Sequence, residues 1–547
     1  MIFAEPWPAP SAARRALSEA YRADEDRIVE ARLAEAALPA EAKARIKARA
    51  RDLVGAVRKA QHGQGGIESF LHEYSLSSKE GIVLMCLAEA LLRIPDAGTA
   101  DLLIRDKLAG ADWSRHVGSS DSLFVNASTW ALMLTGRVVR LDDPERQDLT
   151  GTLGRLVARA GEPIIRQAVM QAMRILGRQF VMGRTIQEAL DRARPAEEKG
   201  YRHSFDMLGE AARTANDARR YFEAYAHAIE AIGRARGNRD EFEGPSISVK
   251  LSALHPRYQF AQHKRAVAEV GASLLALAEA AKRAGIGLTV DAEEADRLDL
   301  SLDVIERVAR APSLKGWNGL GLAIQAYQKR CMPLIGWLAH VADETGRRFN
   351  VRLVKGAYWD TEVKRAQERG LDGYPVFTRK ASTDVSYVAC AKALFADARA
   401  FYPQFATHNA VTLATILELA GGRTDFEFQR LHGMGEQLYA EIVGPERLGL
   451  ACRVYAPTGS HEDLLPYLVR RLLENGANTS FVNRIVDETM PVDAIVADPA
   501  DKLRSLASKP HPGIPLPARL FGAERANSTG LDLSDPAALV PLARAME

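Results

Sequence analysis

Two segments of the sequence concentrate side chains that could do chemistry. The run VRLVKGAYWD at 351–360 brings the cations Arg352 and Lys355 next to a glycine and two aromatic residues. Two cations and a glycine suit the close approach of an anionic group, and the aromatic rings offer a planar wall. A second run, FTRKASTD at 377–384, adds hydroxyl groups and further cations. Two adjacent cationic segments fit a pyrophosphate better than a single phosphate.

The run HEDLLPYLVRRLLENGAN at 461–478 predicts a helix that carries a second constellation. Its acidic start and the glycine past its end are typical of a capped helix. Spacings of three and four place on one face Tyr467, Arg470, Arg471 and Glu474. One interpretation is a surface helix with an Arg470–Glu474 pair worth roughly a few tenths of a kcal/mol. The other is a carboxylate site, because paired guanidinium groups form bidentate charge-assisted hydrogen bonds.

Eight short β-rich runs alternate with amphipathic helical segments after residue 201. The predicted strands are RHSFDML (202–208), ISVKLSAL (247–254), IGLTVDAE (286–293), GLAIQAY (321–327), NVRLVKGAY (350–358), QFATHN (404–409), FEFQRLHG (426–433) and CRVYAP (452–457). Eight such units in roughly 270 residues match a (β/α)8 barrel of the α/β class in length and alternation. A doubly wound open sheet is the alternative.

Nearly every predicted strand carries a polar or charged residue near its C-terminal end, which is the end of a barrel that holds the active site. These residues are Glu210, Lys250, Asp291, Gln325, Lys355, Tyr358, His408, His432 and Tyr455. Because the pattern recurs in all eight strands, we predict a shared site at this end. About 45 residues separate Tyr358 from Gln404, and we expect this connection to be a long functional loop.

Two helical regions precede the predicted barrel. Residues 1–61 form a predicted arm of Ala-, Arg- and Glu-rich helices with weak apolar content, which we expect to wrap over another part of the molecule or a partner subunit. Residues 62–181 have the pattern of a structural helical domain without a titratable cluster. We assign residues 182–525 to the barrel and residues 526–547 to a linker.

Composition argues against several classes of protein. The 72 basic and 70 acidic residues give a net charge of +2, which provides no whole-chain field for nucleic acid or an anionic membrane. The N-terminus lacks the apolar region of a secretory signal, and the longest strongly apolar stretch, 82–92, is too short to span a bilayer. The chain is expected to be cytoplasmic, or at most peripheral at the inner membrane. Buried, reduced thiols are expected at Cys86, Cys331, Cys390 and Cys452.

Other kinds of site are disfavoured by missing motifs. The sequence has no P-loop and no G-x-G-x-x-G after a strand, which disfavours a nicotinamide or a Rossmann-bound flavin. His408 and His432 lie on neighbouring predicted strands without the spacing of metal ligands. No G-x-S-x-G elbow or catalytic Cys–His context accompanies them. We therefore predict no metal site.

Five blocks of the sequence, in this order, resemble the proline dehydrogenase domain of the proline utilization A family. They are SVKLSALHPRY, TVDAEEADRL, RLVKGAYWD, EFQRLHGMGE and YLVRRLLENGANTSFVNR. The resemblance spans nearly the whole chain and implies an enzyme that binds FAD non-covalently. It implies transfer of a hydride from proline C5 to flavin N5, which gives Δ1-pyrroline-5-carboxylate, the first step of proline catabolism to glutamate. Ubiquinone in the membrane would reoxidise the flavin.

The resemblance also decides the order of the strands. ANTSFVN at 477–483 could serve as an eighth strand if RHSFDML were discarded. In the family, the last helix of the barrel sits over the barrel mouth. RHSFDML is therefore expected to be the first strand and CRVYAP the eighth.

On the substrate side, the resemblance implies a clamp, a wall and a gate. Arg470 and Arg471 would clamp the proline carboxylate together with Lys250, which Asp291 would hold in register. The wall around the pyrrolidine ring would consist of Tyr455, Tyr467 and Leu431, with Tyr358 also at the substrate. Glu210 would pair with Arg470 and close the site.

On the cofactor side, the resemblance implies contacts of FAD with strand ends and the loops that follow them. The matching residues are Gln325, Arg352, Val354, Lys355, Gly356, Ala357, Tyr358, Trp359, Thr378, Lys380, Thr383, His408, Asn409, Gln429, Glu474 and Ser480. Arg352 would stabilise negative charge on the reduced isoalloxazine. A hydride acceptor needs position rather than a nucleophile, so a site without a triad or metal is consistent with this chemistry.

The sequence departs from the family pattern at both ends. Full-length members continue into an aldehyde dehydrogenase domain, whereas this chain stops at LDLSDPAALVPLARAME. We therefore expect a fragment without the second activity and without the channel between the two sites. Some members begin with a ribbon-helix-helix DNA-binding domain. Here the arm starts almost at Met1, and no nucleic-acid partner is expected.

Two other functions remain open at this point. One is a different FAD barrel, of the methylenetetrahydrofolate reductase kind, which would share the flavin face but not the arginine pair. The other is a helical scaffold with a degenerate barrel that binds a partner protein. Flavin absorbance would argue against the scaffold, and its loss on addition of L-proline, but not of folates, would separate the two enzymes.

Overall fold

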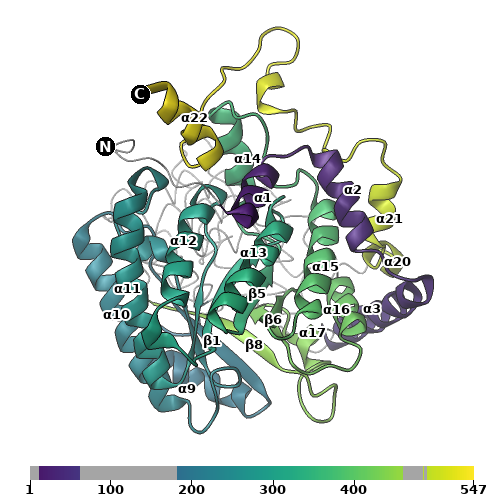
Figure 1. The fold of residues 1–547 in the computed structure, drawn as a ribbon. Coiled ribbons are helices and arrows are strands. Elements are labelled where there is room, and N and C mark those ends of the chain that lie inside the picture. Colours follow the sequence, from purple (N-terminus) through teal and green to yellow (C-terminus); the bar gives the residue numbers. More distant parts are fainter. Residues whose placement is uncertain (1–10, 62–180, 460–484, 486–488, 547) are drawn as a thin grey trace, which may run out of the picture.

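A computed structural model describes residues 11–61, 181–459, 485 and 489–546. Its centre is a closed barrel of eight parallel strands in sequence order (Figure 1). The strands are β1 (Tyr201–Met207), β2 (Ser246–Val249), β3 (Gly287–Val290), β4 (Leu320–Gln325), β5 (Phe349–Val354), β6 (Phe401–Ala406), β7 (Glu427–Leu431) and β8 (Cys452–Thr458). β1 closes the barrel against β8, with Tyr201 opposite Cys452 and Met207 opposite Thr458. The predicted barrel is confirmed, including RHSFDML as its first strand.

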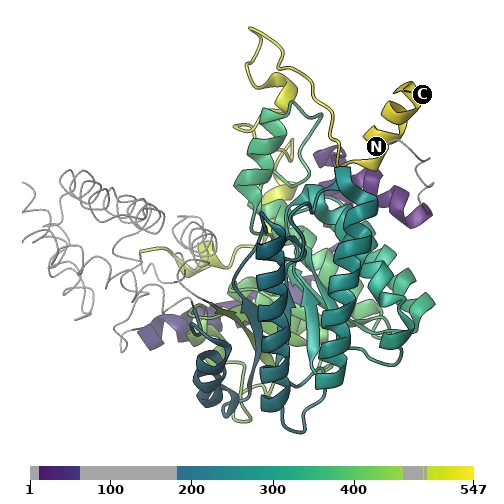
Figure 2. The same cartoon turned by 90° about the vertical axis from the view of Figure 1, so that its left-hand side faces the viewer.

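Helices surround the strands on the outside (Figures 1 and 2). They are α9 (Ile186–Glu197), α10 (Ala215–Ala235), α11 (His263–Ala284), α12 (Leu298–Ala309), α13 (Cys331–Thr345), α14 (Trp359–Glu368), α15 (Lys380–Ala396), α16 (Ala410–Ala420) and α17 (Glu436–Ala440). Short 3-10 turns lie between them at η2 (Leu251–Ala253), η3 (Phe260–Gln262), η4 (Ala295–Arg297) and η5 (Pro312–Leu314). Local sequence sets the boundaries: Thr214 and Asp217 form a capping box that starts α10, and Gly285 ends α11 with φ +66°.

The connection between β5 and β6 differs from the expected long loop. It contains two helices, α14 and α15, so only residues 369–379 between them are irregular. The N-terminal ends of these helices, at Trp359 and Lys380, lie within the two segments predicted to bind an anion. The connection therefore brings two helix starts, rather than one open loop, to the active end of the barrel.

The two faces of the strands have different chemistry. Phe205, Ile247, Leu288, Phe405 and Phe428 belong to one apolar cluster with the surrounding helices. The alternate positions point into the barrel, because successive side chains of a strand face opposite sides. Most of these inward positions are polar, whereas barrel interiors are ordinarily filled with bulky branched residues. The interior of this barrel is therefore a column of hydrogen bonds and ion pairs.

The predicted arm consists of three helices that pack on the outside of the barrel. They are α1 (Ala12–Ala20), α2 (Glu25–Glu35) and α3 (Ala40–Gln61). α1 contacts α13, α2 contacts α15, and α3 contacts α16 and α17. Leu17 and Val29 are fully buried in these contacts. The prediction that the arm covers another part of the molecule is confirmed.

The C-terminal segment returns to the arm and to α14. Its helices are α20 (Val492–Ile495), α21 (Pro499–Arg504), η6 (Pro517–Arg519) and α22 (Pro536–Met546). α21 packs on α15, η6 packs on α14, and Figures 1 and 2 show the yellow segment running past these helices. Arg22 of the arm forms ion pairs of 2.8 Å with Asp532 and with Asp535. The segment predicted to be a linker, 526–547, thus contains a helix and two carboxylates bound to the arm.

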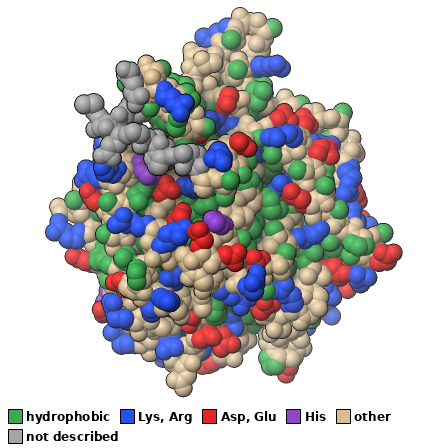
Figure 3. All heavy atoms as spheres, viewed as in Figure 1, with side chains coloured by type: hydrophobic (Ala, Val, Ile, Leu, Met, Phe, Trp, Pro, Cys, Tyr) green, Lys and Arg blue, Asp and Glu red, His purple; other side chains and the backbone are tan. Residues whose placement is uncertain are grey.

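Other sequence expectations concern surface and composition. The face in Figure 3 intersperses basic and acidic side chains, in keeping with the small net charge. None of the helices in the described ranges combines the length and apolar character of a bilayer span. Cys331, Cys390 and Cys452 are buried free thiols, as predicted. Cys86 and all but the last residue of the predicted helical domain at 62–181 lie outside the described residues.

Candidate active site

The ammonium group of Lys250 is the centre of a buried cluster at the C-terminal ends of the strands. Its Nζ lies 2.6 Å from Oδ1 of Asp206, 3.1 Å from Oδ2 of Asp291 and 3.3 Å from the hydroxyl of Tyr455. The Tyr455 hydroxyl in turn donates to Asp291 Oδ2 at 2.7 Å. These residues come from β1, β8 and the ends of β2 and β3, so closure of the barrel is what brings them together.

Arg352 extends this cluster toward the barrel axis. Its Nη1 lies 2.6 Å from Asp291 Oδ1, and its Nε donates to Gln429 Oε1 at 2.7 Å. Its Nη2 donates to the hydroxyls of Ser248 and Ser204 at 2.9 and 3.2 Å. The guanidinium carbon also lies 5.0 Å from the centroid of the Tyr455 ring, within cation–π range. These four hydrogen bonds leave the guanidinium group little freedom to turn.

Burial and charge act in opposite directions on these groups. Burial disfavours the charged form of Lys250, but Asp206, Tyr455 and Asp291 raise its pKa well above the ordinary value. Burial also opposes ionisation of Asp291, yet Lys250 and Arg352 hold the pKa of Asp291 below its ordinary value. For Asp206, burial prevails over Lys250 and raises the pKa. The cluster therefore keeps a lysine cation between two carboxylates of unequal acidity.

Of the predicted site residues, the structure brings together Lys250, Asp291, Arg352, Gln429 and Tyr455. The sequence analysis missed Asp206, Ser204 and Ser248, which complete the cluster. A signal was available, because Ser204 and Asp206 lie in β1 with the same two-residue period as the polar residues of other strands. Asp206 is fully buried, and its Oδ2 has no hydrogen-bond partner among the described residues.

Lys355 follows β5 and lies beside the start of α15. Its ammonium pairs with Asp384 and lies 3.3 Å from the hydroxyl of Thr412. Lys380 reaches the other oxygen of Asp384 at 3.4 Å. Burial lowers the pKa of Lys355, and Asp384 acts in the opposite direction. Two predicted anion-binding lysines thus converge on one carboxylate.

Thr378 has a partner that the sequence did not predict. Its backbone N–H and its hydroxyl both donate to Oε1 of Glu25 in the arm, at 2.8 and 3.0 Å. The same hydroxyl accepts a hydrogen bond from the backbone N–H of His511 at 2.8 Å. Glu25 is only 5% exposed. The arm and the C-terminal segment therefore meet at the segment that leads into α15, where Thr383 is also buried.

The remaining residues predicted around β4 and β5 lie at the ends of these strands, and of them Gln325 is buried and Ala357 exposed. Gln325 ends β4, where its Nε2 donates to the carbonyl of Glu293 at 3.2 Å and its Oε1 accepts from Gln328 at 2.6 Å. Val354 ends β5. Gly356 has φ +135°, and a Cβ there would lie 2.4 Å from the ring of Tyr327, so only glycine fits. Ala357 and Tyr358 lead into α14, and the indole N–H of Trp359 donates to the carbonyl of Phe377 at 2.8 Å.

His408 and Asn409 follow β6, and Leu431 ends the neighbouring strand β7. The backbone N–H of Leu431 donates to Nε2 of His408 at 3.0 Å, so the neutral ring carries its proton on Nδ1. Asn409 caps α16 by accepting from the N–H groups of Val411 and Thr412. Burial lowers the pKa of His432 to about 3, which keeps that ring neutral.

Some predicted residues are not joined to the cluster by the described contacts. Glu210 lies half-buried after β1. The predicted helix over the barrel mouth lies outside the described residues, together with Tyr467, Arg470, Arg471, Glu474 and Ser480. Among the described residues, no group of three or more His, Cys, Asp or Glu side chains is arranged to hold a metal ion.

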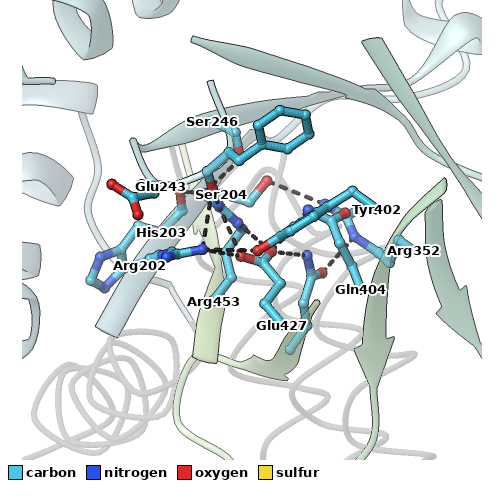
Figure 4. Close-up of polar contacts among 12 residues, drawn as sticks. Arg202, His203, Ser204, Glu243, Ser246, Arg352, Tyr402, Gln404, Glu427 and Arg453 are labelled. Carbon is cyan, nitrogen blue, oxygen red and sulfur yellow. Dashed lines mark hydrogen bonds and ion pairs between the residues drawn. The ribbon is translucent and has the colours of Figure 1, made fainter. Parts of the chain in front are cut away.

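A second ionic cluster lies below Arg352, deeper in the barrel (Figure 4). Glu427 of β7 pairs with Arg453 of β8, whose Nε lies 2.6 Å from Glu427 Oε1. Arg202 of β1 lies 3.2 Å from Glu427 Oε2 and donates to the hydroxyl of Tyr402 at 3.0 Å. Arg453 also donates to the carbonyls of His203 and Gly244. The sequence analysis did not single out any of these residues.

Three family models match the sequence. The model described as proline dehydrogenase matches residues 189–484, which is more than half of the chain and includes the barrel. The model described as proline utilization A proline dehydrogenase N-terminal domain matches residues 11–58. A third, described as DNA-binding domain of proline dehydrogenase, matches residues 66–180. That match falls on undescribed residues, and the expected lack of a nucleic-acid partner stays a prediction.

Full-length relatives and solved structures agree with these matches. The bifunctional protein PutA of Klebsiella aerogenes is 52% identical over 559 residues, which cover 100% of this chain and 42% of that protein. The protein of the same description from Rhizobium meliloti is 50% identical over 551 residues and is covered to 44%. The chain thus spans less than half the length of these curated relatives.

A crystal structure of a variant of Bradyrhizobium japonicum proline utilization A is 51% identical to the chain, with a TM-score of 0.76. The match covers 99% of this chain and 53% of that one. The barrel, the arm and the matching family models indicate the same family. The chain belongs to the proline dehydrogenase family, in which it corresponds to the proline dehydrogenase region of proline utilization A.

Proposed function

We propose that the chain catalyses the FAD-dependent oxidation of L-proline to Δ1-pyrroline-5-carboxylate and passes the electrons to a quinone. The observation that carries this proposal is the buried cluster of Lys250, Asp291 and Arg352 at the C-terminal strand ends of a proline dehydrogenase barrel. The quinone acceptor is proposed from the family resemblance, as is the aldehyde dehydrogenase domain as a partner within a longer protein.

The contacts of Lys250 support its role in binding the substrate carboxylate. Its three N–H groups face Asp206, Asp291 and Tyr455. The contact with Tyr455 is the longest, and the Tyr455 proton is already donated to Asp291. A substrate carboxylate can therefore replace Tyr455 as the third partner of Lys250 without leaving a buried group unpaired. Arg470 and Arg471 would complete the clamp.

A fixed carboxylate also orients the rest of the substrate. Proline is a rigid ring, so a clamp at its carboxylate determines where C5 lies and removes orientational entropy from the reaction. The ring of Tyr455 and the side chain of Leu431 would bound the pyrrolidine. Asp291 keeps Lys250 and Arg352 on either side of one carboxylate, so the substrate-binding and the cofactor-facing cations share a support.

The described residues fit FAD in their charge and their position. Lys355 and Lys380 share the single carboxylate of Asp384, and Arg379 donates to the carbonyls of Lys509 and Pro510 rather than to a carboxylate. The start of α15 thus retains positive charge for a pyrophosphate, while Arg352 would face the flavin ring. Thr378 donates two hydrogen bonds to Glu25 and would thereby hold the segment before α15 in place for the cofactor. When bound, FAD supplies the hydride acceptor.

An absorbance titration of the purified, FAD-loaded chain tests the proposal. Addition of L-proline without oxygen is expected to bleach the flavin absorbance, and a soluble ubiquinone analogue is expected to restore it. 5-Methyltetrahydrofolate, the folate that can donate a hydride to a flavin, and other amino acids are expected to leave the spectrum unchanged. Bound flavin that L-proline does not reduce would contradict the proposed substrate, and bleaching by the folate alone would favour the other flavin barrel.

A further inference from the structure

Glu427 lies beneath the proposed active site and touches none of the groups proposed to contact proline or FAD except one. Its carboxylate is fully buried. Oε1 accepts hydrogen bonds from Arg453 Nε at 2.6 Å, from Gln404 Nε2 at 2.8 Å and from Gln429 Nε2 at 3.1 Å. Burial opposes its ionisation, but Arg453 and Arg202 hold the pKa of Glu427 below its ordinary value. Glu427 is therefore a charged, acceptor-only group.

Gln429 connects this carboxylate to Arg352. The Gln429 amide donates through Nε2 to Glu427 and accepts through Oε1 from Arg352 Nε, at 2.7 Å. An ionised carboxylate can only accept and a guanidinium can only donate. The two charged neighbours therefore impose one orientation on the amide, and an inverted amide would meet a mismatched partner on both sides.

We propose that Glu427 is a positioning residue for the reaction. Through Gln429 it fixes the orientation of Arg352, and with it the guanidinium that pairs with Asp291 and would face the flavin. The inference rests on the proposed function for the role of Arg352, but the coupling itself is a property of the barrel interior, where Figure 4 labels its two ends, Glu427 and Arg352. None of the three residues Glu427, Gln429 and Arg352 is proposed to contact proline itself.

The contacts from Glu427 through Gln429 to Arg352 form a relay, which the substitution Glu427→Gln breaks in a defined way. Either oxygen of Glu427 faces at least two donors, so the new NH2 group meets donors wherever it points. At the Oε2 position both donors are guanidinium groups, of Arg202 and Arg453, which cannot become acceptors. At the Oε1 position two of the three donors are the amides of Gln404 and Gln429, which can invert, so the NH2 group is expected there. Inversion of Gln429 turns its NH2 group toward Arg352 and displaces the guanidinium.

Two effects of Glu427→Gln on a bound flavin have opposite signs. Loss of a negative charge, acting through space, would favour the reduced, more negative flavin and raise its midpoint potential. Loss of Arg352 from its position would remove a nearby cation and lower that potential. The relay predicts the second effect, so the sign of the shift separates positioning from simple electrostatics.

Gln404 provides a matched control. It donates to the same oxygen of Glu427 as Gln429 does, at a similar distance, and it lies opposite Arg352 on the neighbouring strand. Its own Oε1 has no hydrogen-bond partner among the described residues, so it does not pass the contact on to Arg352. Gln404→Met therefore removes one hydrogen bond to Glu427 but leaves the relay intact.

The experiment measures the midpoint potential of bound FAD by titration with dithionite, which requires no reaction with proline. In Glu427→Gln we expect a roughly ten-fold shift against the reduced form, or about 30 mV for a two-electron couple. Gln429→Met, which keeps the ion pairs of Glu427, is expected to shift the potential in the same direction, and the double variant no further. Gln404→Met is expected to behave like the unaltered chain.

Several results would overturn the inference. A raised or unchanged potential in Glu427→Gln would do so, as would additive shifts in the double variant or an equal shift in Gln404→Met. If Glu427→Gln does not fold, Glu427→Asp replaces it, because the shorter side chain keeps the charge but draws the carboxylate away from Gln429, and the same fall in potential is expected. Crystal structures of the same variants without flavin give an independent readout, namely whether Arg352 has left Asp291. Failure of proline to bleach the flavin would contradict the proposed function and leave these measurements interpretable.

Discussion

Lys250 is held by three partners, and two of them are carboxylates of different acidity. Asp291 is shared with Arg352, whereas Asp206 has Lys250 as its only described cation within 4 Å. The ammonium of Lys250 thus neutralises a carboxylate that would otherwise be buried without a counter-ion. Its proposed role in binding the substrate is therefore tied to its pairing with the two carboxylates at the strand ends.

Lys250→Met should raise KM for L-proline by roughly 10- to 100-fold, because a charge-assisted hydrogen bond contributes about 1.5–3 kcal/mol. Flavin content should remain unchanged. Steady-state kinetics with L-proline, together with the absorbance of the purified variant, measure both quantities. Lys364→Met is the control, since Lys364 is 75% exposed and its ion pair among the described residues is with Glu368 on α14. An unchanged KM in Lys250→Met would remove Lys250 from the substrate site.

The sequence predicted the polar residues at the C-terminal ends of the strands but not those deeper in the barrel interior. Lys250, Asp291 and Tyr455 were found because they lie at strand ends, where the fold class alone indicates chemistry. Glu427 and Arg453 lie inside strands that are buried on both faces. Burial on both faces leaves no alternation of polar and apolar surroundings from which the inward side could be read. Their ionic partners are also up to 225 residues away in the sequence.

Among the secondary-structure elements, α14 carries a carboxylate in an unfavourable place. Glu362 accepts a hydrogen bond from the backbone N–H of Ala295 in η4, at 2.7 Å. Burial raises the pKa of Glu362 from 4.5 to about 7, the bond from Ala295 opposes this, and Asp296 and Glu294 add to it. Between these two pH values the folded chain keeps a proton that the unfolded chain releases. The free energy of unfolding therefore decreases as the pH rises through this window.

Glu362→Gln is expected to remove this pH dependence. The amide oxygen can still accept from Ala295, but the side chain cannot ionise, so the variant avoids a penalty on the order of 3 kcal/mol above pH 7. Urea denaturation at pH 5 and at pH 8 measures the difference between variant and unaltered chain. We expect that difference to favour the variant more strongly at pH 8. Equal differences at the two pH values would show that Glu362 does not titrate in this range.

The elements themselves were largely predictable, and the exceptions have a physical cause. Each of the eight strands could be located, because β-rich runs bounded by helical patterns are a strong local signal. The connection between β5 and β6 was expected to be a loop, although it contains α14 and α15. Both helices begin without a side-chain cap at their N-terminus, so the usual sequence signal for a helix start is missing there.

Across the whole molecule, the arm and the C-terminal segment meet at one arginine. Arg22 binds Asp532 and Asp535, which are 3% and 4% exposed, and also Asp372 in the segment between α14 and α15. Burial raises the pKa of Asp535, and Arg22 counteracts this. No local pattern predicts such a contact, since about 510 residues separate its partners.

Arg22→Ala should destabilise the chain by about 3–5 kcal/mol, because it leaves buried carboxylates without their cation. Chemical denaturation gives the free energy of unfolding, and limited proteolysis should show faster cleavage in the C-terminal segment. Arg45→Ala is the matched control in the same arm: Arg45 is 62% exposed and pairs with Glu418, so its loss should cost less than about 1 kcal/mol. Similar losses in both variants would mean that Arg22 has no special role.

The ionic cluster deep in the barrel also has a consequence for how relatives of this chain can diverge. Arg202, Glu427 and Arg453 come from β1, β7 and β8, and Glu427 is the carboxylate that pairs with both arginines. Loss of Glu427 alone leaves two cations without it in the barrel interior and is therefore selected against, whereas an exchange of the whole set for apolar side chains is tolerated. Across evolutionary lineages, these three positions are expected to change together or not at all. An alignment in which they vary independently would show that water or another group supplies the missing partner.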